Sequence, residues 1–121
     1  MKILWNIVFA ISLLTFFGCE KNEIKKWTVQ YKVENRGIEV ATYRMIYQLR
    51  GGATKSVGPL TDRIWESEIL GDFESGTPVQ IEMEILSGAG KYDVSILRDG
   101  AIHEKETLEK GEVYLLIESE I

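Results

Sequence analysis

Apolar and polar residues alternate through most of the chain after Lys26. Successive side chains of a β-strand point to opposite sides of a sheet, so this alternation predicts strands with one buried face. The run 78–85 is the clearest, because apolar residues occupy every second position from Val79 to Ile85. The expected strands cover residues 27–34, 39–49, 65–70, 78–85, 92–98, 101–107 and 113–118.

Glycine, proline, asparagine and aspartate mark the connections between these runs. Asn35-Arg36-Gly37 separates the first two strands, which we expect to form a hairpin. Asp99-Gly100 predicts a second, two-residue hairpin, because both of its turn positions require positive φ angles. The other connections are a long loop at 50–62, a turn region at 71–77, and shorter turns at 87–90 and 110–111.

Seven short strands, with no helical pattern after residue 19, predict an all-β fold. Turns about every ten residues favour an antiparallel β-sandwich of about seven strands with an immunoglobulin-like architecture. The expected core residues are Trp27, Tyr31, Val79, Ile81, Met83, Val94, Ile96, Leu115 and Ile117.

The first nineteen residues differ in composition from the rest of the chain. Met1 and Lys2 form a positively charged start, residues 3–17 carry no charge, and Gly18 and Cys19 follow. A basic region, an apolar region and a small residue in this order are typical of a secretory signal. The uncharged run of 15 residues is short for a membrane-spanning helix, which needs about 20 residues.

A small residue directly before the only cysteine resembles the lipobox of bacterial lipoprotein signals. The resemblance implies that Cys19 becomes the N-terminus, carries acyl chains such as palmitate, and attaches the protein to the bilayer. Two acyl chains hold a protein stably at a membrane, whereas one chain does so only marginally. A secreted chain without lipid and an uncleaved anchor remain open alternatives. The expected domains are a signal peptide at 1–18, a tether at 19–26 and a β-sandwich at 27–121.

Composition narrows the function classes. The chain has 121 residues, a formal charge of −5, one cysteine and one histidine, which supports one domain and excludes an intrachain disulfide and a two-histidine zinc site. Without residues 1–18 the chain has 103 residues and, because Lys2 is lost, a charge of −6. Since nucleic-acid binding requires a basic face, we expect no nucleic-acid partner.

Few residues form a pattern that is typical of catalysis. The segment 51–56 lacks the glycine that a phosphate-binding loop needs directly before its lysine, and 88–91 lacks the following serine or threonine. His103 has no suitable serine or aspartate near it in the sequence. We expect it to be an edge-strand residue that, with Lys105, hinders pairing with other strands. We therefore expect no catalytic residue, no cofactor and no enzymatic activity.

Two groups of residues leave a binding function open. The first is a set of carboxylates around one turn, Glu66, Glu68, Asp72 and Glu74. Such oxygens could bind calcium, but the spacing of a calcium-binding loop is absent, and a solvated acidic face is the simpler interpretation. The second group shares one side of a strand and consists of Tyr43, Tyr47 and Leu49. It forms either core or, if it is uncovered, a binding surface.

The remaining pattern joins alternating strands to glycine-containing turns: Trp27-x-Val29-x-Tyr31, Trp65, Val79-x-Ile81, Gly88-x-Gly90-x-Tyr92-x-Val94-x-Ile96 and Asp99-Gly100. Over residues 29–119 it resembles the MmpS-like small membrane proteins and related small bacterial β-sandwich lipoproteins. The resemblance implies a periplasmic sandwich that is tethered to a membrane and assists RND-type lipid exporters. It transfers no functional residue, because the shared positions are structural.

These observations predict a membrane-anchored, non-enzymatic binding or accessory module of the bacterial cell envelope, with an envelope protein or a transporter as partner. We expect it on the inner or outer membrane, facing the periplasm or the cell surface. The alternative is an acidic inhibitor of a basic hydrolase such as a lysozyme, since a charge of −6 would steer a cationic target at low salt.

Overall fold

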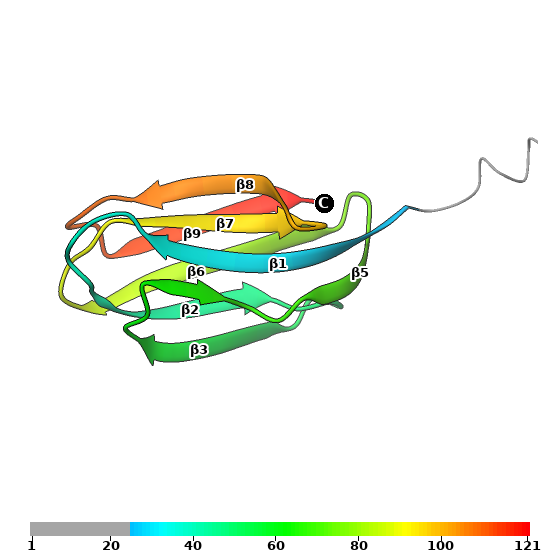
Figure 1. Ribbon diagram of the computed structural model, residues 1–121. Coiled ribbons are helices and arrows are strands. Elements are labelled where there is room, and N and C mark those ends of the chain that lie inside the picture. Colours follow the sequence, from blue (N-terminus) through cyan, green and yellow to red (C-terminus); the bar gives the residue numbers. More distant parts are fainter. Residues whose placement is uncertain (1–24) are drawn as a thin grey trace, which may run out of the picture.

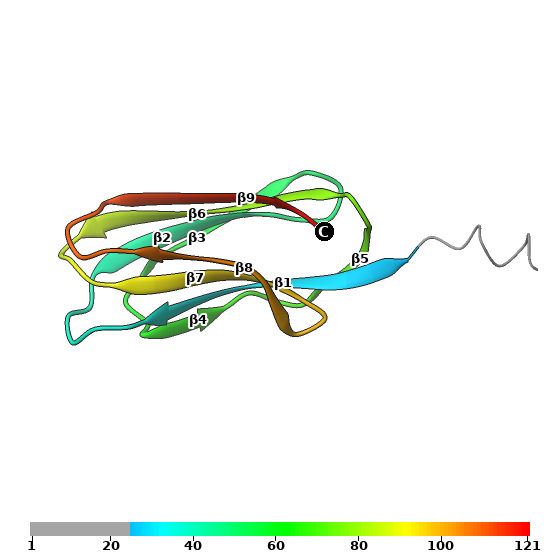
Figure 2. The same cartoon turned by 90° about the horizontal axis from the view of Figure 1, so that it is seen from above.

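The computed structural model describes residues 25–121, which form two packed antiparallel sheets (Figures 1 and 2). The β-sandwich predicted from the alternation is confirmed, with nine strands rather than seven and no helix in this range. The strands are β1 (Lys26–Asn35), β2 (Thr42–Gln48), β3 (Thr54–Leu60), β4 (Ile64–Glu66), β5 (Leu70–Glu74), β6 (Pro78–Ser87), β7 (Tyr92–Arg98), β8 (Ala101–Leu108) and β9 (Tyr114–Glu120).

Both sheets combine strands that are distant in sequence. In the first, sheet A, β1 lies between β7 and the two short strands β4 and β5, and β8 pairs with the other side of β7. In the second, sheet B, the order is β3-β2-β6-β9. The chain therefore crosses repeatedly from one sheet to the other, and its crossing connections gather at the ends of the sandwich.

The two ends of the sandwich differ in the segments that they contain (Figure 1). The chain enters β1 at what we call the proximal end, where the C-terminal Ile121 is also buried. The distal end lies opposite and contains the connections 36–41, 61–63, 88–91 and 109–113. An attachment through the N-terminal segment would therefore leave the distal connections on the far side of the domain.

The buried faces predicted from alternation are confirmed on most strands. Two expected core residues, Trp27 and Leu115, are half-buried and pack against the core. The fully buried ones are Tyr31, Val79, Ile81, Met83, Val94, Ile96 and Ile117.

Four buried tyrosines fill the centre of the core. The ring centroids of Tyr31 and Tyr47 lie 5.2 Å apart, as do those of Tyr43 and Tyr92. Tilted aromatic pairs at this separation contribute about 0.5–1.5 kcal/mol beyond the burial of their surface. Each pair joins one ring from sheet A to one ring from sheet B, so the pairs also hold the sheets in register.

Two of the tyrosine hydroxyls form hydrogen bonds with the backbone of the opposite layer. The hydroxyl of Tyr31, on β1, donates to the carbonyl of Gln48, on β2, at 2.8 Å. The hydroxyl of Tyr92, on β7, accepts the N–H of Ala41, just before β2, at 2.8 Å. Because a buried polar group without a partner is costly, these bonds allow tyrosine where phenylalanine would otherwise serve.

The other two hydroxyls bond to connections between strands. Tyr43 donates to the carbonyl of Asp62, in the connection from β3 to β4, at 2.7 Å. Tyr47 donates to the carboxylate of Glu68, between β4 and β5, at 2.9 and 3.0 Å. The tyrosines thus secure the chain where it leaves regular strand structure.

The expected hairpin of the first two strands is wrong. β1 pairs with β4, β5 and β7, whereas β2 pairs with β3 and β6 in the other sheet. Arg63 supports the crossing, since its guanidinium donates to the carbonyls of Gly37 and Ile38 at 3.2 and 2.8 Å. A turn signal shows that the chain changes direction, but it does not show which sheet the chain enters.

The expected loop at 50–62 and the turn at 71–77 are also wrong. Residues 54–60 form β3, an edge strand that is mostly exposed and therefore lacks the alternation of a half-buried strand. β5 occupies part of the second region with Phe73 as its single buried residue. The expected strand 65–70 is in fact interrupted, because β4 ends at Glu66 and β5 begins at Leu70.

The Asp99-Gly100 hairpin is confirmed. Asp99 has a φ of 51° and Gly100 a φ of 81°, which are the left-handed conformations that a two-residue turn requires. The carboxylate of Asp99 also accepts the backbone N–H of Thr28 at 2.8 Å. The hairpin is thereby attached to the start of β1 at the proximal end.

Replacing Tyr92 with phenylalanine should leave the buried N–H of Ala41 without an acceptor. We expect the free energy of unfolding to fall by about 1–3 kcal/mol, measured by urea denaturation. Tyr114→Phe is the matched control. Because Tyr114 is exposed, removal of its hydroxyl should lower the free energy of unfolding by less than about 0.5 kcal/mol. Equal effects of the two substitutions would contradict this role of Tyr92.

Alkaline pH should destabilise the fold through the same tyrosines. Burial and the bond to Glu68 raise the pKa of Tyr47 from 10.0 to about 12, and burial raises the pKa of Tyr31 and Tyr43. The stability that these raised pKa values contribute is complete below pH 10 and is lost as the pH rises toward 12. The urea midpoint should therefore decline over this range, less steeply in Tyr47→Phe, and a midpoint independent of pH would refute the assignment.

Candidate partner-binding surface

The outer face of sheet A has balanced charges. The carboxylate of Asp93 lies 3.3 Å from Arg36 Nε and 3.8 Å from Lys105 Nζ. Lys32 Nζ lies 3.9 Å from the carboxylate of Glu66. The exposed pair of Lys32 and Glu66 contributes only about 0–1 kcal/mol to stability. Together the three pairs leave little net charge for the recognition of a charged partner.

The outer face of sheet B is acidic by contrast. β6 contributes Glu82 and Glu84 to this face and β9 contributes Glu118, at positions that alternate with core residues. Arg44, on β2, forms an ion pair with Glu84. No lysine or arginine of residues 25–121 pairs with Glu82 or Glu118. The carboxylates on this face therefore keep a net negative potential.

Tyr114 lies on the acidic face, and the negative potential there affects the pKa of its hydroxyl. It lies opposite Glu84 in the pairing of β6 with β9. Desolvation and the carboxylates of Glu82, Glu84 and Glu118 raise the pKa of the Tyr114 hydroxyl. The carboxylates thus act together on one part of the surface rather than as isolated exposed charges.

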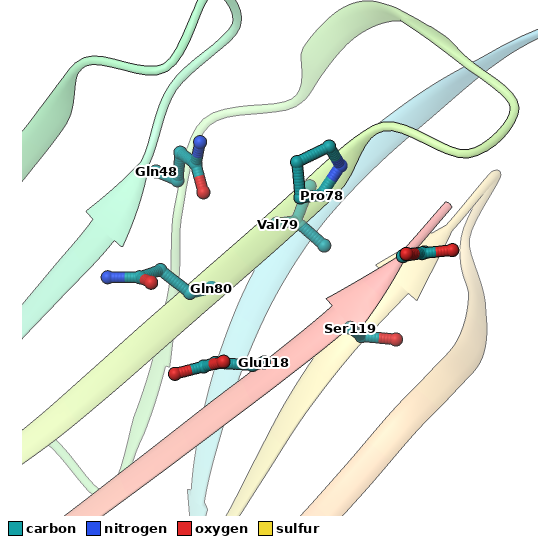
Figure 3. A pocket seen from close by; sticks show the side chains of 7 residues that line it. Gln48, Pro78, Val79, Gln80, Glu118 and Ser119 are labelled. Atoms are coloured by element: carbon teal, nitrogen blue, oxygen red, sulfur yellow. The ribbon is translucent and has the colours of Figure 1, made fainter.

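A shallow hollow of about 300 Å³ lies where the acidic face reaches the proximal end. Three strands of sheet B contribute polar side chains to it, among them Gln48, Gln80 and Glu118 (Figure 3). Gln80 and Glu118 lie directly opposite each other in the pairing of β6 with β9. The hollow offers amide oxygens and the carboxylates of Glu118 and Glu120, so its chemistry favours contact with cationic or hydrogen-bonding groups.

The distal end exposes large apolar side chains. Ile38 is 91% exposed and Val113 63%. The full set at or beside the distal connections is Ile38, Val40, Ile64, Leu86, Val113 and Tyr114. Clustered exposed apolar residues are typical of interaction sites. The sequence carried no signal for them, because Val40, Val113 and Tyr114 lie in expected strands and the others lie at the borders of expected strands and turns.

Hydrogen bonds and ion pairs link the distal connections to one another. The N–H of Arg36 donates to the carbonyl of Lys91 at 2.7 Å. Lys110 Nζ lies 2.9 Å from the carboxylate of Glu39, and Lys91 Nζ lies 3.6 Å from that of Glu109. The distal apolar residues are therefore presented by connections that support one another.

Cys19, the expected lipid attachment site, lies outside the described residues. His103 lies on β8, and its Nε2 is 2.5 Å from the carbonyl of Glu120, at the edge of β9. Residues 51–56 span a turn and the start of β3. Residues 88–91 form the connection from β6 to β7, so neither segment precedes a helix.

The carboxylates around one turn do not converge. Glu66 pairs with Lys32, and Glu68 contacts Tyr47 and Lys55. Hydrogen bonds from the backbone and Tyr47, together with Lys55, lower the pKa of Glu68 against the effect of desolvation. No group of three or more potential metal ligands occurs within residues 25–121, so the calcium interpretation finds no support there.

The second candidate surface is core. Tyr43 and Tyr47 are fully buried, and Leu49 packs against the buried residues. The outward side of β2 instead presents Arg44 and Gln48, which belong to the acidic face and its hollow. The period of the strand was therefore correct, but the choice between core and surface required the second sheet.

Comparison with known proteins yields no relative: no family model, curated protein or solved structure matches the chain. Within residues 25–121, no helix is long and apolar enough to cross a bilayer.

Proposed function

We propose that this protein is a non-enzymatic binding module of the bacterial cell envelope, attached to the inner or outer membrane by acyl chains on Cys19. The observation that supports this proposal best is the difference between the two ends of the domain. The chain enters at the proximal end, while within residues 25–121 six of the eight exposed large apolar residues lie at or beside the distal connections, Ile69 and Ile102 being the exceptions. A membrane attachment at Cys19 would present the distal end toward a partner.

The length of the segment between Cys19 and Lys25 fits this arrangement. Six residue steps span at most about 20 Å when fully extended, so the proximal end would stay close to the bilayer. At that end Lys25 Nζ lies 4.2 Å from the ring centroid of Trp27, and the guanidinium of Arg98 lies 4.1 Å from it. Tryptophan and basic side chains are favoured at membrane interfaces.

The partner in this proposal is an envelope protein, and the resemblance to MmpS-like proteins suggests an RND-type transporter. A partner that rises from the same membrane can contact both the long sides and the distal end of a tethered sandwich. Tethering also raises the effective concentration of the two proteins, so that a modest interface suffices.

Lipid attachment can be tested by metabolic labelling with an alkyne analogue of palmitate. We expect label on the wild-type protein and none on Cys19→Ser, because the thiol is the single cysteine sulfur available for acylation. Mass spectrometry of the labelled protein should show a chain that begins at Cys19. An unlabelled wild type, or a chain that retains residues 1–18, would contradict the proposed anchor.

The acidic face favours a second candidate function, inhibition of a basic hydrolase such as a lysozyme. Glu82 and Glu118 lack cationic partners within residues 25–121 and could bind a cationic surface around an active site.

Inhibition of lysozyme at low salt tests this second candidate. The double variant Glu82→Gln, Glu118→Gln should inhibit several-fold less strongly than wild type, because each exposed ion pair contributes roughly 0.2–1 kcal/mol. The double variant Asp72→Asn, Glu74→Gln, on β5 of the other sheet, makes the same change of net charge and is the matched control, which should leave inhibition unchanged. Failure of the wild type to inhibit under these conditions would eliminate this function.

A further inference from the structure

The edges of the two sheets are not equally protected against pairing with another strand. An edge strand has unpaired N–H and C=O groups, and proteins usually interrupt such edges with short strands, bulges or proline. Within residues 25–121, β4 and β5 are short and separate, the pairing of β8 shifts register, and β3 contains Pro59. β9 pairs with β6 at seven successive positions without a register shift or a proline.

The register shows which backbone groups of β9 are free. The N–H of Ile85 donates to the carbonyl of Val113, and the N–H of Ile121 donates to the carbonyl of Thr77. Odd-numbered residues of β9 therefore exchange their bonds with β6. The N–H and C=O groups of Tyr114, Leu116 and Glu118 point away from β6, toward the open edge.

His103 limits this edge at one end. Its Nε2 contacts the carbonyl of Glu120, the next even-numbered residue after Glu118. The contact confirms independently that even-numbered carbonyls of β9 point outward. β8 lies beside β9 but belongs to the other sheet and pairs with β7. The outward groups from Tyr114 to Glu118 therefore stay unpaired within residues 25–121, over a length that suits a short added strand.

Carboxylates flank the open edge on both faces. On the outer face lie Glu118 and, diagonally across the pairing with β6, Glu82. On the inner side, β8 places Glu104 and Glu106 opposite the buried residues Ile96 and Val94, so these carboxylates lie on the face of sheet A that adjoins sheet B. A strand added to β9 would have negative charge near both of its faces.

From these observations we infer that the edge of β9 binds an extended, cationic segment of a partner protein as an additional strand of sheet B. The backbone groups of Tyr114, Leu116 and Glu118 supply the hydrogen bonds, and the carboxylates select basic side chains. A second copy of this chain fits less well, because its own β9 would bring Glu118 and Glu120 against an edge that is already acidic. The inference rests on the proposed binding function and names the site and the partner's chemistry.

The experiment uses the full chain in detergent and a short synthetic peptide that alternates lysine with threonine. We expect saturable binding by isothermal titration calorimetry. Two peptides serve as controls: one with glutamate in place of lysine, and one with N-methylated amides along one edge. Neither should bind, because the first has the wrong charge and the second cannot donate backbone hydrogen bonds. These peptide controls do not alter the protein, so its folding cannot obscure the result.

Two protein variants locate the site. Leu116→Pro removes an outward N–H without removing a bond to β6, and proline is tolerated at such edge positions; it should weaken binding at least about tenfold. Glu118→Lys should weaken binding several-fold, about the effect expected from reversing one exposed charge. Glu74→Lys is its matched control, with the same change of net charge on the opposite side of the sandwich, and should bind like wild type.

Three results would overturn the inference. If the N-methylated peptide binds as well as the parent peptide, the acidic surface attracts cations without adding a strand. If Leu116→Pro abolishes a dimer of the wild-type chain, a second copy uses the edge. If no peptide binds, the edge is closed. Peptide binding that persists in Cys19→Ser would separate this site from the proposed lipid anchor, so either claim can fail alone.

Discussion

Four tyrosines buried between the sheets hold this sandwich together. Their rings pair across the core, and their hydroxyls bond to Ala41, Gln48, Asp62 and Glu68. These partners all lie at or near points where the chain leaves a strand. The tyrosines therefore contribute twice, because they fill the interior with aromatic surface and satisfy the backbone at the connections. The orientation of the two sheets, and hence everything on the surface, depends on them.

The buried residues that stabilise the fold are different from the surface residues that are available to a partner. The buried tyrosine hydroxyls are used in holding the sheets, and burial raises the pKa of those of Tyr31 and Tyr43. What remains for a partner lies outside: the acidic face of β6 and β9, the distal apolar residues and the edge of β9. Charge pairing neutralises the outer face of sheet A but not that of sheet B. The two sheets stabilise each other through the shared core, but only sheet B has an outer face with a strong negative potential.

Alternation predicted the fold class and most buried faces, because strands such as β6 have one side in the core and one in solvent. It failed for β3 and β5, which are exposed edge strands with too few buried residues to produce a pattern. It also could not pair the first two strands correctly, since a turn such as 35–37 does not specify a sheet. The acidic positions of β6 were predicted to face outward, but their lack of cationic partners depends on where β2 and β9 lie. The free groups of β9 could be found only from the register.

Amide hydrogen exchange along β9, followed by NMR in the full chain, tests the central claim that this strand is an open edge. The N–H groups of Leu115, Ile117 and Ser119 should exchange slowly, because they bond to β6. Those of Tyr114, Leu116 and Glu118 should exchange fast and become protected when a cationic strand is added. Uniform slow exchange along β9 in the absence of any partner would show that the edge is already covered, and would contradict the account.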